Sequence, residues 1–98
     1  MSHINAKITA LRELIDTIKF AETVIDRSAL FSAMRLLCDD LHTDKDVNGY
    51  AQGKAFDVRW HAGAALGFDE TNGHSSEQHL VWAMGALNVL ESEIGQAL

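Results

Sequence analysis

Apolar residues recur in alternating steps of three and four along four stretches of this chain, and no proline interrupts its 98 residues. Steps of three and four place side chains on one face of a 3.6-residue helix, so each stretch is typical of an amphipathic helix. A chain of this length suits one domain. We therefore predict an all-α fold in which residues 1–98 form a single domain, a bundle of four antiparallel helices.

The first helix is predicted from Ile4 to about Ile25, with an apolar stripe interrupted once, by Glu22. The members of the stripe are Ile4, Ile8, Leu11, Ile15, Ile18, Glu22 and Ile25. Phe20 and Val24 lie four residues apart on a different face of this helix. The helix therefore has apolar side chains to bury on two sides, which predicts a homodimer or larger closed oligomer assembled through it.

The second helix has a stripe that is out of phase with the first. Its members are Leu30, Met34, Leu37 and Leu41. The step of five between the two stripes predicts a break near residues 26–28, where Asp26 and Ser28 are good caps for a new helix. Cys38, the only cysteine, is interpreted as a small buried side chain, because free cysteines are commonly buried.

The third helix is predicted from about Tyr50 to Leu66, and the fourth is predicted to begin at Ser75 or Ser76 and to end at Gly95. The stripe of the third helix is rich in alanine and consists of Ala51, Ala55, Val58, Ala62 and Ala65. The stripe of the fourth consists of Leu80, Ala83, Leu87, Leu90 and Ile94. The small residues indicate that the third helix lies in the middle of the packing.

The pattern Trp-x-x-Gly-Ala occurs twice, at residues 60–64 and 82–86. A glycine inside a helix costs about 0.5–1 kcal/mol relative to alanine. Two glycines at matching positions therefore suggest that each leaves a notch for a bulky neighbour, with coincidence as the alternative.

Charge is distributed unevenly along the chain. The net charge is −6, and no lysine or arginine follows Arg59. Because nucleic-acid binding depends on lysine and arginine displacing counterions, we expect no nucleic-acid partner. Four carboxylates gather ahead of the third helix with only Lys45 opposing them, and these are Asp39, Asp40, Asp44 and Asp46. They are predicted either to contact a basic surface of a partner protein or to form an ordinary solvated surface.

The segment Asp44–Gly49 resembles the first half of an EF-hand calcium loop, with oxygen ligands at positions 1, 3 and 5 and glycine at position 6. The resemblance ends there, because Ala55 occupies the position of the bidentate glutamate. Asp, Asn and Gly also suit an ordinary turn between helices. Two interpretations stay open: a solvated turn, and a divalent-cation site formed by Asp44, Asp46 and Asn48.

The five histidines are scattered, and none of their spacings is that of a helical zinc pair. A metal site assembled by folding is a minor alternative, and it would use His42, His74 and His79 with Asp69 or Glu77. No nucleophile elbow or other local catalytic signature is present, which favours a protein that is not an enzyme. We expect no cofactor.

No apolar run approaches the roughly 20 residues that a membrane span needs, and the first residues lack the hydrophobic core of a signal peptide. We therefore expect a cytoplasmic protein without a membrane partner.

The surplus of apolar faces predicts a small acidic helical protein–protein interaction module, acting as a regulator, adaptor or inhibitor of a macromolecular partner. Its predicted partner-binding residues are the four carboxylates named above and four apolar side chains, Phe20, Val24, Trp60 and Trp82. Two alternatives remain. One is a cation-binding module at the Asp44 turn, and the other is a small-ligand or enzymatic bundle with a pocket near Trp60 and His61.

Overall fold

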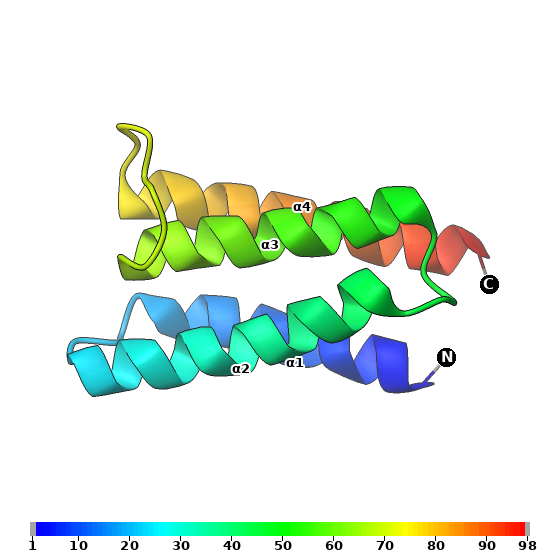
Figure 1. Ribbon diagram of the computed structural model, residues 1–98, viewed down its shortest axis with the longest axis horizontal. Helices are drawn as coiled ribbons and strands as arrows, with labels where there is room; N and C mark the ends of the chain where they lie inside the picture. The colour runs from blue at the N-terminus through cyan, green and yellow to red at the C-terminus, as the bar shows by residue number, and fades with distance from the viewer. Residues whose placement is uncertain (1, 98) are drawn as a thin grey trace.

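The computed structural model describes residues 2–97 and contains four helices in that range. They are α1 (Ser2–Ile18), α2 (Val24–Thr43), α3 (Gly49–Leu66) and α4 (Ser76–Ala97). Figure 1 shows them side by side along a common direction, each antiparallel to the next. The predicted all-α bundle of four antiparallel helices is confirmed.

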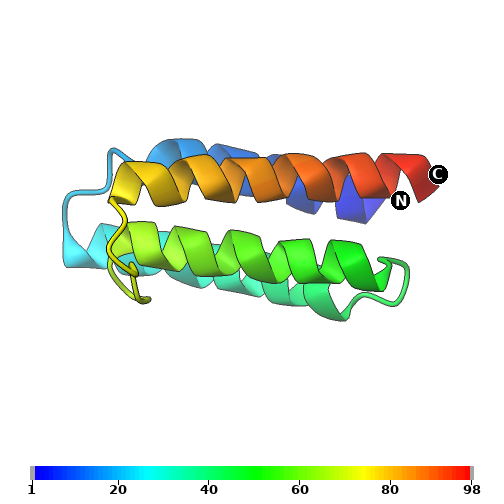
Figure 2. The same ribbon diagram turned by 90° about the horizontal axis from the view of Figure 1, so that it is seen from above.

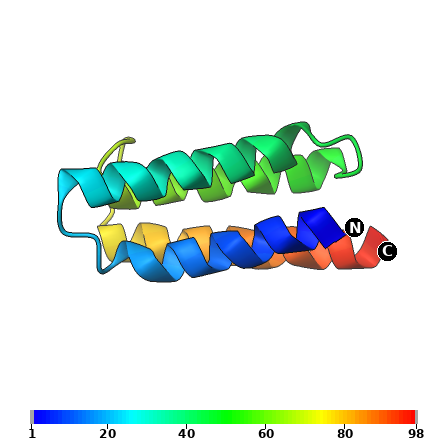
Figure 3. The same cartoon turned by 90° about the horizontal axis from the view of Figure 1, so that it is seen from below.

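The helices are arranged in two layers of two. Figure 1 places the α3–α4 pair above the α1–α2 pair, and Figures 2 and 3 show α1 beside α4 and α2 beside α3. The most extensive contact is between α3 and α4, whereas α1 and α3, which lie across one diagonal, touch only slightly. Side chains of all four helices therefore meet along one central axis.

One cluster of buried side chains fills this axis. Most of the predicted stripe residues belong to it, namely Ile4, Ile8, Leu11, Ile15, Ile18, Met34, Leu41, Ala51, Ala55, Val58, Ala62, Ala65, Ala83, Leu87, Leu90 and Ile94. The alanines of α3 allow its backbone to approach the neighbouring helices closely. The predicted stripes are confirmed as the core, with an exception where α1 meets α2.

That exception is the position of the break between the first two helices. The sequence predicts one helix as far as Ile25 and new caps at Asp26 or Ser28, but α1 ends at Ile18 and α2 already begins at Val24. The cap is Thr23, whose Oγ1 accepts a hydrogen bond from the Asp26 backbone N–H at 3.0 Å. Both predicted caps therefore lie inside α2.

The earlier break changes the orientation of the residues that follow it. Residues 19–23 no longer continue the helical phase of α1, so Glu22 and Ile25 leave the stripe and are exposed. Phe20 lies in the connection and Val24 is the first residue of α2. The predicted pairing of Phe20 and Val24 on one helix face is therefore wrong.

The start of α4 is as predicted, but its end is not. Ser75 Oγ accepts a hydrogen bond from the Gln78 backbone N–H at 3.1 Å, which caps the helix. The helix continues through Gly95 to Ala97. Among the described glycines only Gly67 and Gly73 have a positive φ, so Gly95 does not adopt the left-handed conformation that ends many helices.

The two glycines of the repeated Trp-x-x-Gly-Ala pattern have different surroundings. A Cβ atom added to Gly63 would meet the Asp69 carboxylate and would lie 2.9 Å from Cε1 of Phe31. A Cβ atom added to Gly85 would meet nothing within 4 Å. The predicted notch therefore exists at Gly63, where Phe31 and the Asp69 carboxylate fill it, and not at Gly85.

The connection between α3 and α4 contains two left-handed elements. Gly67, with φ 92°, ends α3 and donates its N–H to the Ala64 carbonyl at 3.2 Å. Asn72 and Gly73 have φ values of 52° and 82°, and the His74 N–H donates to the Thr71 carbonyl at 3.1 Å, which together describe a type I′ turn. The turn fixes the position of the Thr71 carbonyl beside the start of α4.

Polar contacts join the first helix to the last. The guanidinium of Arg12 on α1 donates to Asn88 Oδ1 at 2.9 Å and to Glu91 Oε1 at 3.0 Å, and lies 3.2 Å from Met84 Sδ, all on α4. These contacts cover the edge of the core between the two helices. Within residues 2–97 none of the helices combines the length and hydropathy required to cross a bilayer.

Candidate functional sites

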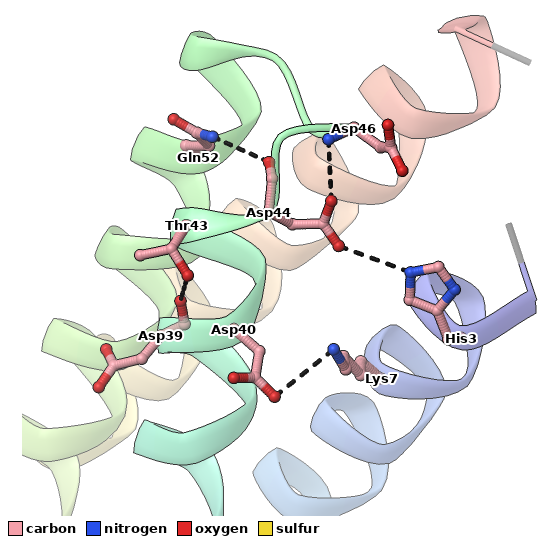
Figure 4. A network of polar contacts seen from close by, with 8 residues as sticks. All are labelled: His3, Lys7, Asp39, Asp40, Thr43, Asp44, Asp46 and Gln52. Carbon is pink, nitrogen blue, oxygen red and sulfur yellow. Dashed lines mark hydrogen bonds and ion pairs between the residues drawn. The ribbon is translucent and has the colours of Figure 1, made fainter.

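The predicted acidic cluster lies where α2 ends, and Figure 4 shows its polar contacts. Asp40 Oδ2 lies 3.5 Å from Nζ of Lys7 on α1, and Asp39 Oδ1 lies 3.8 Å from Nη1 of Arg59 on α3. From the sequence, Lys45 was the only cation expected near these carboxylates. That prediction is wrong, because the bundle also brings Lys7 of α1 and Arg59 of α3 close to them. Two of the four carboxylates therefore have cationic partners within the chain.

The Asp44 turn uses its oxygens in local contacts. Asp44 Oδ1 accepts a hydrogen bond from the Asp46 N–H at 2.8 Å, and its Oδ2 lies 3.6 Å from Nε2 of His3 (Figure 4). Asn48 Oδ1 accepts from the Ala51 N–H at 2.9 Å and so caps α3. Within residues 2–97 no group of three or more His, Cys, Asp or Glu side chains is arranged to hold a metal ion. This geometry is that of a capped turn, and two of the three candidate cation ligands already serve as caps.

An exposed apolar surface lies where α1 passes into α2. We name it the apolar corner, and it consists of Phe20, Val24 and Ile25, whose exposed fractions are 72%, 75% and 80%. Beside it is a hollow of about 290 Å³ between the end of α1 and the first turns of α2, walled by Phe20, Ala21 and Leu30. Large apolar side chains that are this exposed and this close in sequence are typical of contact surfaces.

Aromatic rings from α3, α4 and their connection form a second grouping, which we name the His–Trp cluster. Its members are Trp60, His61, His74, His79 and Trp82. The His61 ring centroid lies 4.5 Å from that of Trp60 and 5.4 Å from that of Trp82. The two tryptophans that the sequence predicted as contact residues are thus brought together around histidine.

His79 is the fully buried centre of this cluster. Its Nε2 lies 2.8 Å from the Thr71 carbonyl oxygen, and its Nδ1 lies 3.0 Å from Nδ1 of His61. A carbonyl oxygen only accepts, so Nε2 of His79 carries the hydrogen, and in the neutral ring Nδ1 is then an acceptor. With both rings neutral, His61 donates from Nδ1 and its Nε2 carries no hydrogen.

The surroundings also favour the neutral form of His61. Burial lowers the pKa of the His61 imidazole from its ordinary value of 6.5, and His79 lowers it further, whereas Asp57 acts in the opposite direction. Near neutral pH the ring consequently keeps the unprotonated Nε2 that the hydrogen bonds assign. This is the arrangement of a hydrogen-bond acceptor held in one tautomer by a second residue.

Two other candidate residues from the sequence, His42 and Cys38, lie outside the His–Trp cluster. His42 is in the last turn of α2, at the opposite end of the bundle from the start of α4, so it does not join His74 and His79. The thiol of Cys38 is buried as expected, and burial, with a smaller effect of Asp39, raises its pKa to about 12. A thiol in this state is a packing group and a poor nucleophile.

Sequence reasoning missed the central role of His79. One signal was present, because His79 precedes the stripe residue Ala83 by four positions and so continues the buried face of α4. Its partner His61 lies 18 residues earlier on another helix, and the contacting Thr71 carbonyl depends on the turn at residues 71–74. Neither the His61–His79 contact nor the Thr71–His79 contact can be predicted from the spacing of residues along one helix.

Comparison of the chain with protein-family models, with curated proteins and with solved structures finds no match.

Proposed function

We propose that this protein is a helical protein–protein interaction module that binds its partner through the apolar corner. The observation that supports the proposal is the exposure of Phe20, Val24 and Ile25, each of which leaves more than two thirds of its surface in water. Burying such side chains contributes roughly 25 cal/mol for each Å² removed from water. A partner that covered them would gain binding energy without disturbing the core of the bundle.

The residues around the apolar corner have the composition of a protein–protein interface. The apolar side chains are flanked by charges of both signs, from Lys19, Glu22, Asp26 and Arg27. An apolar centre with a polar rim is the usual arrangement of protein interfaces. The hollow beside Phe20 has room for one apolar side chain of the partner, so the proposed ligand is a protein segment that presents an aliphatic or aromatic anchor.

The acidic cluster is a weaker candidate for the same role. Two of its carboxylates are paired with Lys7 and Arg59, and the Asp44 carboxylate accepts a backbone hydrogen bond. A basic partner would therefore compete with cations that the chain already supplies. We assign the cluster to bundle stability and helix capping, and the apolar corner to partner binding.

We also propose that the protein self-associates, and that it does so through the apolar corner. The homo-oligomer was predicted from two apolar faces of the first helix, and one of them, the α1 stripe, is buried inside the chain's own core, so a second copy would have to open the bundle to reach it. A second copy could instead meet the exposed corner. Sedimentation of the wild type at high micromolar concentration distinguishes a 10.8 kDa monomer from a dimer.

The proposal is tested with peptides selected from a displayed random library on the wild-type protein. We expect the selected peptides to share an apolar anchor residue. Their affinity should fall at least tenfold for the variant Phe20→Ser with Ile25→Ser, because interface anchors each contribute more than about 1 kcal/mol. Val81→Ser is the matched control, since Val81 is similarly exposed but lies on α4. Equal affinity for the double variant and the wild type would sink the proposal.

A further inference from the structure

A groove of about 440 Å³ lies between α3 and α4, and the proposed interaction function does not use it. We name it the His61 groove. Its walls include His61, Trp82 and Val89, its floor includes Gly85, and Lys54 and Asp57 also line it. The residues come from two helices that pack extensively against each other, so the groove is a fixed feature of the bundle.

The dimensions of the groove follow from the positions on α4. Trp82 and Val89 are seven residues apart, which places them about 10 Å apart along the helix axis and on the same face. Gly85 lies between them, and a Cβ atom added there would meet nothing within 4 Å. The glycine therefore leaves an open space between two apolar side chains, of a length that suits a single aromatic ring.

His61 brings a hydrogen-bond acceptor with no partner from the chain to the lining of the groove. His61 uses Nδ1 to donate to His79, and no partner of its Nε2 is found within residues 2–97. Every buried side-chain nitrogen and oxygen of those residues has a hydrogen-bond partner, so the free Nε2 is open to solvent. The Thr71–His79–His61 chain of hydrogen bonds keeps this nitrogen in its acceptor form.

The charged residues at the groove do not require a charged ligand. Lys54 Nζ lies 3.6 Å from Asp57 Oδ2, so the two charges oppose each other. The rest of the lining is apolar apart from His61 and the indole N–H of Trp82. Neutral ligands with an apolar body and one hydrogen-bond donor consequently fit the groove best.

We propose that the His61 groove binds a small neutral aromatic molecule that carries a hydroxyl donor, a ligand of the phenol class. The ring lies over Gly85 between Trp82 and Val89, and the hydroxyl donates to Nε2 of His61. His79 is a positioning residue that fixes the tautomer of His61 through the Thr71 carbonyl. The site is separate from the apolar corner, which lies between α1 and α2, so either proposal can fail without the other.

Two probes of nearly equal shape test the donor requirement. The dissociation constants of p-cresol and of 4-methylanisole, which lacks the hydroxyl hydrogen, are measured by NMR titration of the full chain. We expect p-cresol to bind about threefold to tenfold more tightly, as one net hydrogen bond allows. In His61→Phe the two probes should bind equally, because the acceptor is lost while a ring remains.

Gly85→Leu tests the place of binding without touching either histidine. The leucine side chain fills the space over the floor, so both probes should lose at least tenfold in affinity while the helical circular-dichroism spectrum is unchanged. Gly95→Leu is the matched control, because Gly95 is also an open glycine of α4 but lies outside the groove. The proposal is overturned if neither probe binds at millimolar concentration, or if the wild type does not prefer p-cresol. It is equally overturned if folded His61→Phe keeps that preference or if Gly85→Leu binds as the wild type does.

Discussion

At the scale of single residues, Gly63 and Gly85 show that the same local sequence can have opposite structural meanings. Both occupy the fourth position of Trp-x-x-Gly-Ala on a helix. Gly63 faces Phe31 of α2 and Asp69 of the connection after α3, whereas Gly85 faces open space. A repeated pattern therefore does not imply a repeated environment, because the environment depends on the neighbouring helix.

Alanine substitutions at these two glycines should change stability in opposite directions. Gly85→Ala should raise the free energy of unfolding by about 0.5–1 kcal/mol, because alanine loses less backbone entropy in a helix. Gly63→Ala gains the same propensity, but its Cβ must displace both the Asp69 carboxylate and the partly buried Phe31 ring, an overpacking that costs about 1–3 kcal/mol. A net loss of about 1 kcal/mol is expected. Urea unfolding of both variants measures the difference, and two changes of the same sign would contradict the assigned surroundings.

At the scale of elements, the boundary between α1 and α2 depends on one hydroxyl. Three residues near the boundary have side chains that can cap a helix, Thr23, Asp26 and Ser28. Only Thr23 lies where its oxygen meets the first free N–H groups of α2. Composition alone could not choose among the three, because capping requires an extended backbone at the cap, and Thr23 has φ −97° and ψ 158°.

The assignment of the cap predicts different effects for two alanine substitutions. Thr23→Ala should lower the free energy of unfolding by about 1 kcal/mol, because it leaves the Asp26 N–H without its acceptor. Ser28→Ala lies inside α2, where alanine is the better helix former, so it should leave stability unchanged or raise it slightly. Thermal unfolding of the two variants compares them. A larger loss for Ser28→Ala would restore the boundary that the sequence predicted.

The helices differed in how much the sequence could reveal about them. The α1 and α4 stripes predicted the core correctly, because a side chain such as Leu11 or Leu87 has the same burial requirement wherever the helix packs. The His–Trp cluster could not be predicted in the same way. It depends on the register of α3 against α4, and on a carbonyl oriented by the Asn72–Gly73 turn. The acidic cluster was misjudged for a similar reason, since Lys7 and Arg59 are distant in sequence from Asp39 and Asp40.

At the scale of the whole molecule, the lowered pKa of His61 links the stability of the bundle to pH. The folded chain binds fewer protons at this ring than the unfolded chain, whose His61 titrates near its ordinary value of 6.5. Stability therefore rises with pH between the lowered folded value and 6.5, and is lost as pH falls through that interval. The pKa of His61 is lowered mainly by burial and to a smaller extent by the neighbouring His79.

This linkage predicts a difference between the wild type and His61→Phe. The wild type should lose stability between pH 7.5 and pH 5, and the variant should lose less, because it lacks the group that gains a proton on unfolding. Urea midpoints at several pH values measure both slopes. Parallel slopes would show that the protonation of His61 does not differ between the folded and unfolded chains.

The contact of Arg12 with α4 also determines when α1 becomes covered during synthesis of the chain. Arg12 and Glu91 are 79 positions apart, so α1 acquires its neighbour on that side only after α4 has left the ribosome. Until then the isoleucines of α1 can pack only against α2 and α3. The nascent chain thus exposes an apolar helix face until α4 has emerged, and this is the stage at which a chaperone, or a second nascent chain, would meet it.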